Sequence, residues 1–215
     1  MDSAIDFLFK ISILIFSVVI HEVSHGYAAL ALGDRTAQYA GRLTLNPVPH
    51  IDPFGSVLLP LLLVFTGSPV LFGWAKPVPY NPFYLRNQKW GPAIVGIAGP
   101  GANLLIAVFF AMIIRFVPVS VGDGAMGLFA ANFFGVAASI AFLNLALALF
   151  NLIPIPPLDG SKVLFSALPW QWRSVQAFLE QYGFFVLLFF ILFFSEWISR
   201  AVFSVFRILV GASLF

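Results

Sequence analysis

The residues best able to do chemistry form one pentapeptide, His21-Glu22-Val23-Ser24-His25, in the first part of a 215-residue chain. Residues four apart lie on one face of a helix, about 5–6 Å from each other, so the two imidazoles can bind one metal ion. Glu22, beside the first histidine, can then reach a water molecule held by that metal. The spacing predicts a site for one zinc ion per chain, with Glu22 as its general base.

This pattern rarely arises by chance in the present chain, which has only three histidines. The pentapeptide also lies inside an apolar stretch. An ionisable side chain at membrane depth costs roughly 2.5–3.5 kcal/mol on insertion scales, and it normally persists only with a partner or a function. Both observations favour a functional site over a structural one.

The composition excludes several classes of protein. Hydrophobic residues make up 60% of the chain and charged residues 9%, with a mean hydropathy of +0.98, which excludes an ordinary soluble domain. The net charge of +2 is spread over loops without a basic run, so we expect no nucleic acid partner. Cysteine is absent, which excludes thiolate ligands and leaves His, Asp or Glu to hold a metal.

The apolar runs predict an all-α polytopic membrane protein with four to five transmembrane helices. Runs long enough to cross a bilayer cover residues 5–33, 92–117, 127–152 and 184–212. The stretch 53–73 is broken by prolines and is either re-entrant or an additional span. Since no linker or internal repeat interrupts the chain, we expect residues 1–215 to form a single domain.

Basic residues in the loops predict the orientation. The loops 34–50 and 74–91 both carry lysine or arginine, so the positive-inside rule places both in the cytoplasm and the N-terminus outside. A single crossing by 53–73 would contradict this, which favours the re-entrant alternative for that stretch. The pentapeptide then lies on the order of 10 Å from the cytoplasmic end of its helix.

The loop after the first span contains a short stretch, 37–45, with the composition of a strand. It predicts a small membrane-associated β-ribbon, whose exposed edge could pair with an unwound substrate peptide. The alternative is an ordinary structured loop.

A catalytic zinc site usually has three protein ligands and an open position for water. No third histidine follows the pentapeptide at the spacing of soluble metalloproteases, because position 31 is alanine. Asp159 is the strongest candidate, since the prolines before it unwind the end of a span and can turn its side chain inward. Its alternative role is to cap a following short helix. Glu180 and Glu196 remain as other candidates.

Three separated motifs resemble those of the site-two protease family of intramembrane zinc metalloproteases: HEVSH, the GPxxN pattern from Gly99 to Asn103, and NLIPIPPLDG from Asn151 to Gly160. The resemblance covers most of the chain and implies the roles of six residues. The zinc ligands would be His21, His25 and Asp159, the general base Glu22, and Asn151 and Asn103 would bind substrate or stabilise the oxyanion. With only a short loop at 118–126, the chain is similar to the compact branch without a PDZ domain.

The resemblance implies an intramembrane zinc endopeptidase that cleaves in or near the transmembrane segment of a membrane protein, as in regulated intramembrane proteolysis. Its partners would be that substrate, the lipid bilayer and a regulatory membrane protein, in a prokaryotic cell membrane. A different class remains open: a transporter or metal-handling protein that uses His21, Glu22 and His25 as a transport site.

Overall fold

The computed structural model describes residues 3–66, 74–117 and 125–211, which are mostly helical and contain no β-strand. The long helices are α1 (Ser3–Ala31), α4 (Gly91–Phe116), α5 (Ala125–Asn151) and α7 (Arg173–Val210). The short helices are α2 (Thr36–Tyr39), α3 (Leu59–Phe65) and α6 (Gly160–Ala167). Short 3-10 turns cover Val48–His50, Pro82–Tyr84 and Trp170–Trp172, and a π-helical turn covers Pro53–Leu58.

Within the described residues, four helices are long and apolar enough to cross a membrane: Phe7–Ala31, Gly91–Phe116, Gly127–Asn151 and Trp170–Val210. The four spans expected from the sequence are thereby confirmed. The last one was predicted to begin at residue 184, but α7 already begins at Arg173. Its first turns carry Gln and Glu, which are good helix formers but do not register in a search for apolar runs. At 38 residues α7 is about 57 Å long, so part of it extends beyond a hydrocarbon core of about 30 Å.

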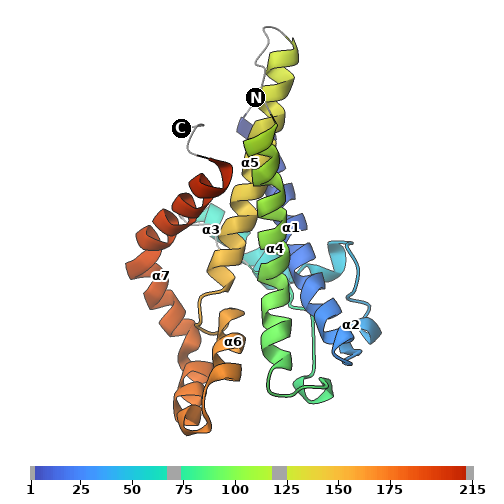
Figure 1. Cartoon of the computed structure of the whole chain (residues 1–215), viewed down its shortest axis with the longest axis vertical. Helices are drawn as coiled ribbons and strands as arrows, with labels where there is room; N and C mark the ends of the chain where they lie inside the picture. The colour runs from blue at the N-terminus through green and yellow to red at the C-terminus, as the bar shows by residue number, and fades with distance from the viewer. Residues whose placement is uncertain (1–2, 67–73, 118–124, 212–215) are drawn as a thin grey trace.

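Helix α4 lies at the centre of the bundle and contacts α1, α5, α6 and α7 (Figure 1). Its interface with α5 and α7 is built on small side chains, including the buried Ala107, Ala111 and Ala141. Small residues let helix backbones approach closely, which is how helices pack in a bilayer without a hydrophobic driving force. Large apolar side chains of α7, such as Phe185 and Phe193, are about two-thirds exposed, as expected for a surface that faces lipid.

The prediction of a β-ribbon at 37–45 is wrong. This stretch begins inside α2 and then turns at Gly41, whose φ is +65°. A ribbon needs a second strand, and the extended segment 74–81, whose Lys76 carbonyl accepts a hydrogen bond from Arg42, contains Pro77 and Pro79. Proline has no N–H to donate to a β-ladder, so the two stretches contact each other without forming a sheet.

The stretch 53–73 is helical where it is described. The π-helical turn from Pro53 is followed directly by α3, which ends at Phe65. These residues extend over about 20 Å, too short for a crossing. The returning half of a re-entrant hairpin would fall on 67–73, outside the described residues, so the structure gives that hairpin no support.

The end of α1 joins three parts of the chain near the site. A Schellman motif closes the helix, with the N–H of Asp34 donating to the Ala29 carbonyl at 2.9 Å and Gly33 at a φ of +105°. The buried Asp34 carboxylate accepts hydrogen bonds from Thr36 and from the Asn81 N–H, at 2.6 Å for the latter. Burial alone would raise the pKa of Asp34, but these hydrogen bonds outweigh it and lower the pKa below its usual range. An ionised Asp34 therefore fastens the extended segment 74–81 to the end of α1.

Candidate metal centre

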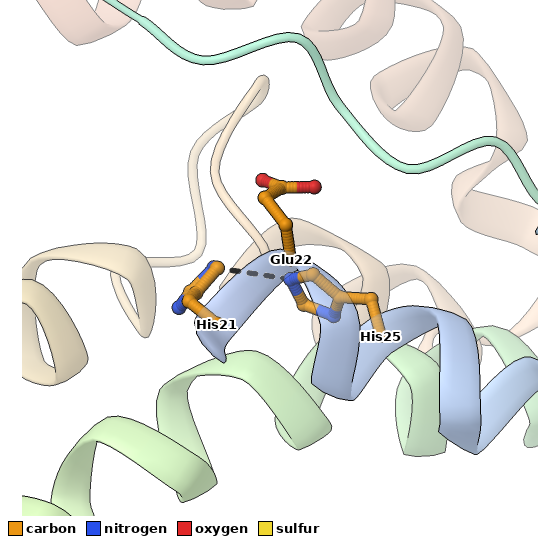
Figure 2. A group of neighbouring side chains, drawn as sticks. All are labelled: His21, Glu22 and His25. Atoms are coloured by element: carbon orange, nitrogen blue, oxygen red, sulfur yellow. Dashed lines mark hydrogen bonds between the residues drawn. The ribbon is translucent and has the colours of Figure 1, made fainter. Parts of the chain in front are cut away.

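His21 and His25 lie one turn apart on α1, and both are 6% exposed. Their Nε2 atoms are 3.0 Å apart, as the dashed line in Figure 2 marks, and the two rings meet edge to face. The helical spacing read from the sequence thus brings both imidazoles into one small buried space.

Helix α4 passes against this pair of rings at Gly99. A Cβ atom added to Gly99 would lie 2.5 Å from Nε2 of His25 and 2.7 Å from Nε2 of His21, far inside ordinary contact distance. Only glycine therefore allows α4 to approach the two imidazoles this closely. The glycine of the GPxxN motif is explained by this contact.

Asp159 completes a cluster of three. Its Oδ2 lies 3.0 Å from Nε2 of His21 and 3.1 Å from Nε2 of His25. Asp159 occupies the N-cap position of α6, but its side chain makes no capping hydrogen bond. Its other oxygen, Oδ1, accepts a hydrogen bond from Nζ of Lys162 at 2.8 Å. The carboxylate is thus held between the imidazole pair and a lysine.

The loop between α5 and α6 delivers Asp159. The prolines of this loop leave few N–H donors, and it is closed by short-range bonds such as Leu158 N–H to the Ile155 carbonyl, 2.9 Å. Gly160 lies against the residues just after α5, since a Cβ there would overlap the Leu152 carbonyl oxygen. This close approach holds the start of α6, and Asp159 with it, near the end of α5.

The alternative third ligands are engaged elsewhere. Glu180 and Glu196 are on the exposed surface of α7. Glu180 accepts a hydrogen bond from Gln176, and Glu196 forms an ion pair with Arg200, one helical turn away in each case.

Hydrogen bonds at Nδ1 fix how each imidazole presents its other nitrogen. Nδ1 of His25 lies 2.6 Å from the Val95 carbonyl oxygen, and Nδ1 of His21 lies 2.6 Å from Oδ1 of Asn103. A carbonyl oxygen only accepts, so Nδ1 carries the proton in both rings. In a neutral ring with its proton on Nδ1, Nε2 presents its lone pair to the space shared with Asp159.

These donors fit a zinc ion. Two Nε2 lone pairs and a carboxylate oxygen, 3.0–3.1 Å apart, repel one another unless a cation lies between them. Two histidines and one carboxylate form a ligand set of catalytic zinc, with a fourth position for water. Ligand atoms about 2.0–2.1 Å from a tetrahedral zinc are roughly 3.3 Å apart, close to the observed separations.

Glu22 lies next to this cluster, with a carboxylate oxygen within 4.8 Å of the histidine nitrogens. Figure 2 shows its side chain directed away from α1, and its Oε2 accepts a hydrogen bond from the Val78 N–H at 2.8 Å. Because Pro77 and Pro79 have no N–H, Val78 provides the only backbone donor of this Pro-Val-Pro stretch. One carboxylate oxygen of Glu22 is thus held in place, and the other has no hydrogen-bond partner among the described residues.

The two asparagines singled out from the sequence lie in different surroundings. Asn103 is fully buried on α4 and contacts His21 directly. Asn151 is half-buried at the end of α5, and its Nδ2 donates to the Leu147 carbonyl at 2.9 Å. Sequence reasoning missed Lys162, although its position three residues after Asp159 at a helix start was a usable signal. It also missed Val78 and Asn144, which no local pattern marks.

Comparisons with known proteins identify the family of this chain. The model of the family described as Peptidase family M50 matches residues 117–194, which include Asp159. The chain is 38% identical over 177 residues to the "Putative zinc metalloprotease YwhC" of Bacillus subtilis, covering 81% of this chain and 76% of that protein. It is 31% identical over 181 residues to the "Putative zinc metalloprotease Rip2" of Mycolicibacterium smegmatis, covering 84% of this chain and 65% of that protein. No solved structure matches the chain.

The similarity to the Bacillus subtilis protein extends over most of both chains. It agrees with the resemblance carried by the three separated sequence motifs, and with a buried cluster of two histidines and an aspartate beside a glutamate. The chain belongs to peptidase family M50.

Proposed function

We propose that this protein is an intramembrane zinc endopeptidase, which hydrolyses a peptide bond in or near a transmembrane segment of a membrane protein. The observation that carries the proposal is the convergence of Nε2 of His21, Nε2 of His25 and Oδ2 of Asp159 within 3.1 Å. The two histidines lie on α1 and pack against α4, and both helices are long and apolar enough to span a membrane. The relatives named as zinc metalloproteases support zinc as the metal.

In this proposal His21, His25 and Asp159 hold the zinc ion and Glu22 is the general base. Zinc in such a site lowers the pKa of a bound water molecule and polarises the scissile carbonyl. Glu22 would take a proton from the water whose oxygen adds to the scissile carbonyl carbon, and would pass that proton to the amine nitrogen as the C–N bond breaks. Lys162 keeps the Asp159 carboxylate turned so that only Oδ2 faces the histidines.

The contact between Val78 and Glu22 gives a prediction. Val78→Pro removes the N–H that holds the Glu22 carboxylate, and a hydrogen bond to a charged group contributes about 1.5–3 kcal/mol, so we expect kcat to fall at least about tenfold. Zinc content should not change, because no proposed ligand is touched. The measurement is cleavage of a transmembrane reporter together with metal analysis. Val78→Ala keeps the N–H and is the matched control, and an unchanged or higher kcat in Val78→Pro would contradict the prediction.

For Asn151 we propose a role in binding substrate or stabilising the oxyanion. Its position at the end of α5, immediately before the loop that carries Asp159, supports this role. We further propose that residues 1–215 act as one domain and that a regulatory membrane protein controls access of the substrate.

We also propose that the protein lies in a prokaryotic cell membrane with its N-terminus outside and the active site nearer the cytoplasm. His25 is six residues before the end of α1, a depth of about 9 Å. Basic residues gather around that end, where the Arg86 N–H donates to the Leu32 carbonyl and Arg42 to the Lys76 carbonyl. The bacterial origin of the relatives supports the assignment to a prokaryotic membrane.

The proposal is tested with the purified, zinc-loaded protein in liposomes and a pooled set of single-span reporter proteins. We expect cleavage inside or beside the apolar segment, located by mass spectrometry. A chelator should stop it, and zinc but not magnesium should restore it. An unfolded soluble protein serves as the comparison substrate. A zinc-loaded protein that cleaves only the soluble substrate, or neither, would refute intramembrane proteolysis.

A further inference from the structure

A chain of buried polar side chains links the metal site to helix α5. Nδ1 of His21 is 2.6 Å from Oδ1 of Asn103, and Nδ2 of Asn103 donates to Oδ1 of Asn144 at 2.7 Å. Nδ2 of Asn144 in turn donates to Oγ of Ser17 at 2.9 Å. Asn103, Asn144 and Ser17 are at most 4% exposed. Polar groups buried in a membrane bundle need partners, and here each of the three hydrogen bonds joins two different helices.

Two backbone carbonyls fix the direction of every hydrogen bond in this chain. Nδ2 of Asn144 lies 2.9 Å from the Ile140 carbonyl, and Nδ2 of Asn103 lies 3.2 Å from the Ser17 carbonyl. Because a carbonyl only accepts, each amide must turn its NH2 group toward that carbonyl. Oδ1 of Asn144 then faces Asn103, and Oδ1 of Asn103 faces His21. The proton of His21 is thereby fixed on Nδ1 and its lone pair on Nε2.

The proton on Nδ1 is held by a different kind of acceptor in each of the two histidines. Nδ1 of His25 is held directly by a carbonyl of the α4 backbone, that of Val95. His21 depends instead on a flexible amide, and both N–H bonds of Asn103 are used to hold that amide in place. A role for Asn103 as an oxyanion donor would require it to release one of these bonds.

We infer that Asn144 is a positioning residue of the metal centre: acting through Asn103, it fixes the ring orientation and tautomer of His21 so that Nε2 faces the metal. The inference rests on the proposed role of His21 as a zinc ligand. Partners of this kind behind a metal ligand typically change metal affinity 10–100-fold when removed. The hydrogen bonds of Asn144 within the described residues go to Asn103, Ser17 and Ile140 and to none of the proposed ligands, so its effect must travel through Asn103.

The test measures the zinc Kd of the purified full-length protein in detergent, by competition with a chromophoric chelator, alongside thermal unfolding of the zinc-free protein. Asn144→Leu removes the acceptor that Asn103 needs, and we expect zinc to bind at least about tenfold more weakly. The matched control is Asn132→Leu, at an exposed position of the same helix, which should leave Kd unchanged.

A second measurement keeps the inference testable should Asn144→Leu fail to fold. Nitrogen-15 NMR of labelled histidines, assigned with His50→Gln and His25→Gln, should show His21 protonated on Nδ1 in the zinc-free wild type. In Asn144→Ala, which removes the oxygen that accepts from Asn103, we expect a mixture of tautomers. Ser17→Ala should keep the Nδ1-protonated form, because the Ile140 carbonyl still orients the amide of Asn144.

The outcomes separate the inference from the proposed function. An unchanged zinc Kd in folded Asn144→Leu, with only the unfolding temperature lowered, would reduce Asn144 to a structural contact between helices. A neutral His21 with its proton on Nε2 and Nδ1 unprotonated in the wild type would overturn the inference as well. Failure of the wild-type protein to bind zinc would instead refute the proposed metal site itself.

Discussion

Glu22→Gln is expected to retain the zinc ion and lose peptide cleavage by at least about 100-fold, since positioned general bases contribute roughly 10²–10⁴-fold. Glutamine keeps the length of the side chain and an oxygen that can accept the Val78 N–H, so the geometry seen at Oε2 should persist. It cannot take a proton from water. His21, His25 and Asp159 are untouched, so metal content should stay at one zinc per chain. Reporter cleavage and metal analysis on the same preparation measure both effects.

The control for this variant is Ser24→Ala, in the same pentapeptide. Oγ of Ser24 donates to the Ile20 carbonyl within α1, at 2.7 Å, so its loss should change cleavage by no more than about twofold. Cleavage that survives in Glu22→Gln would defeat the proposed mechanism. If zinc uptake into liposomes were found in the wild type and persisted in Glu22→Gln, the transport alternative would be favoured instead.

Gly99→Ala is expected to weaken zinc binding on the order of 100-fold and to abolish cleavage with it. The added Cβ would lie within 2.7 Å of Nε2 of both His21 and His25. The rings cannot simply turn away, because hydrogen bonds at Nδ1 hold them to Val95 and Asn103. Either α4 moves away from α1 or the rings tilt, and in both cases the ligand atoms separate. Competition with a chelator measures the zinc Kd, and cleavage of the transmembrane reporter measures the activity.

Gly101→Ala provides the matched control on the same helix. No atom lies within 4 Å of a Cβ added at Gly101, apart from its helix and chain neighbours, so alanine should be accommodated there. Because alanine favours a helix more than glycine does, this variant should be as stable as wild type or more stable. If Gly99→Ala bound zinc with the same Kd as the wild-type protein, the close approach of α4 would not be a constraint on the metal site.

The parts of this protein that sequence predicted well are those determined by neighbours along the chain. Apolar runs predict the long helices because the bilayer demands a certain length of apolar residues. The i,i+4 spacing of His21 and His25 predicts their shared face because the helix repeat alone fixes it. Even Asp159, 138 residues from His21, could be proposed from the prolines that precede it and from a family resemblance.

The parts that could not be predicted depend on how the helices pack against each other. Asn144 is joined to Asn103 across 41 residues and two helices, and nothing near it in the sequence marks that contact. Val78 meets Glu22 only because the segment 74–81 lies across α1. The β-ribbon failed for the same reason: residues 37–45 have the composition of a strand, but strand pairing requires a partner that the sequence pattern does not name.

The extended segment 74–81 has one further consequence. Its Val78 holds the proposed base, and the ring of its Tyr80 lies 5.5 Å from Nζ of Lys162, the cation that orients Asp159. Glu22, the proposed base, and Lys162, which orients Asp159, therefore both contact the segment 74–81. A displacement of this segment is therefore expected to disturb both contacts together.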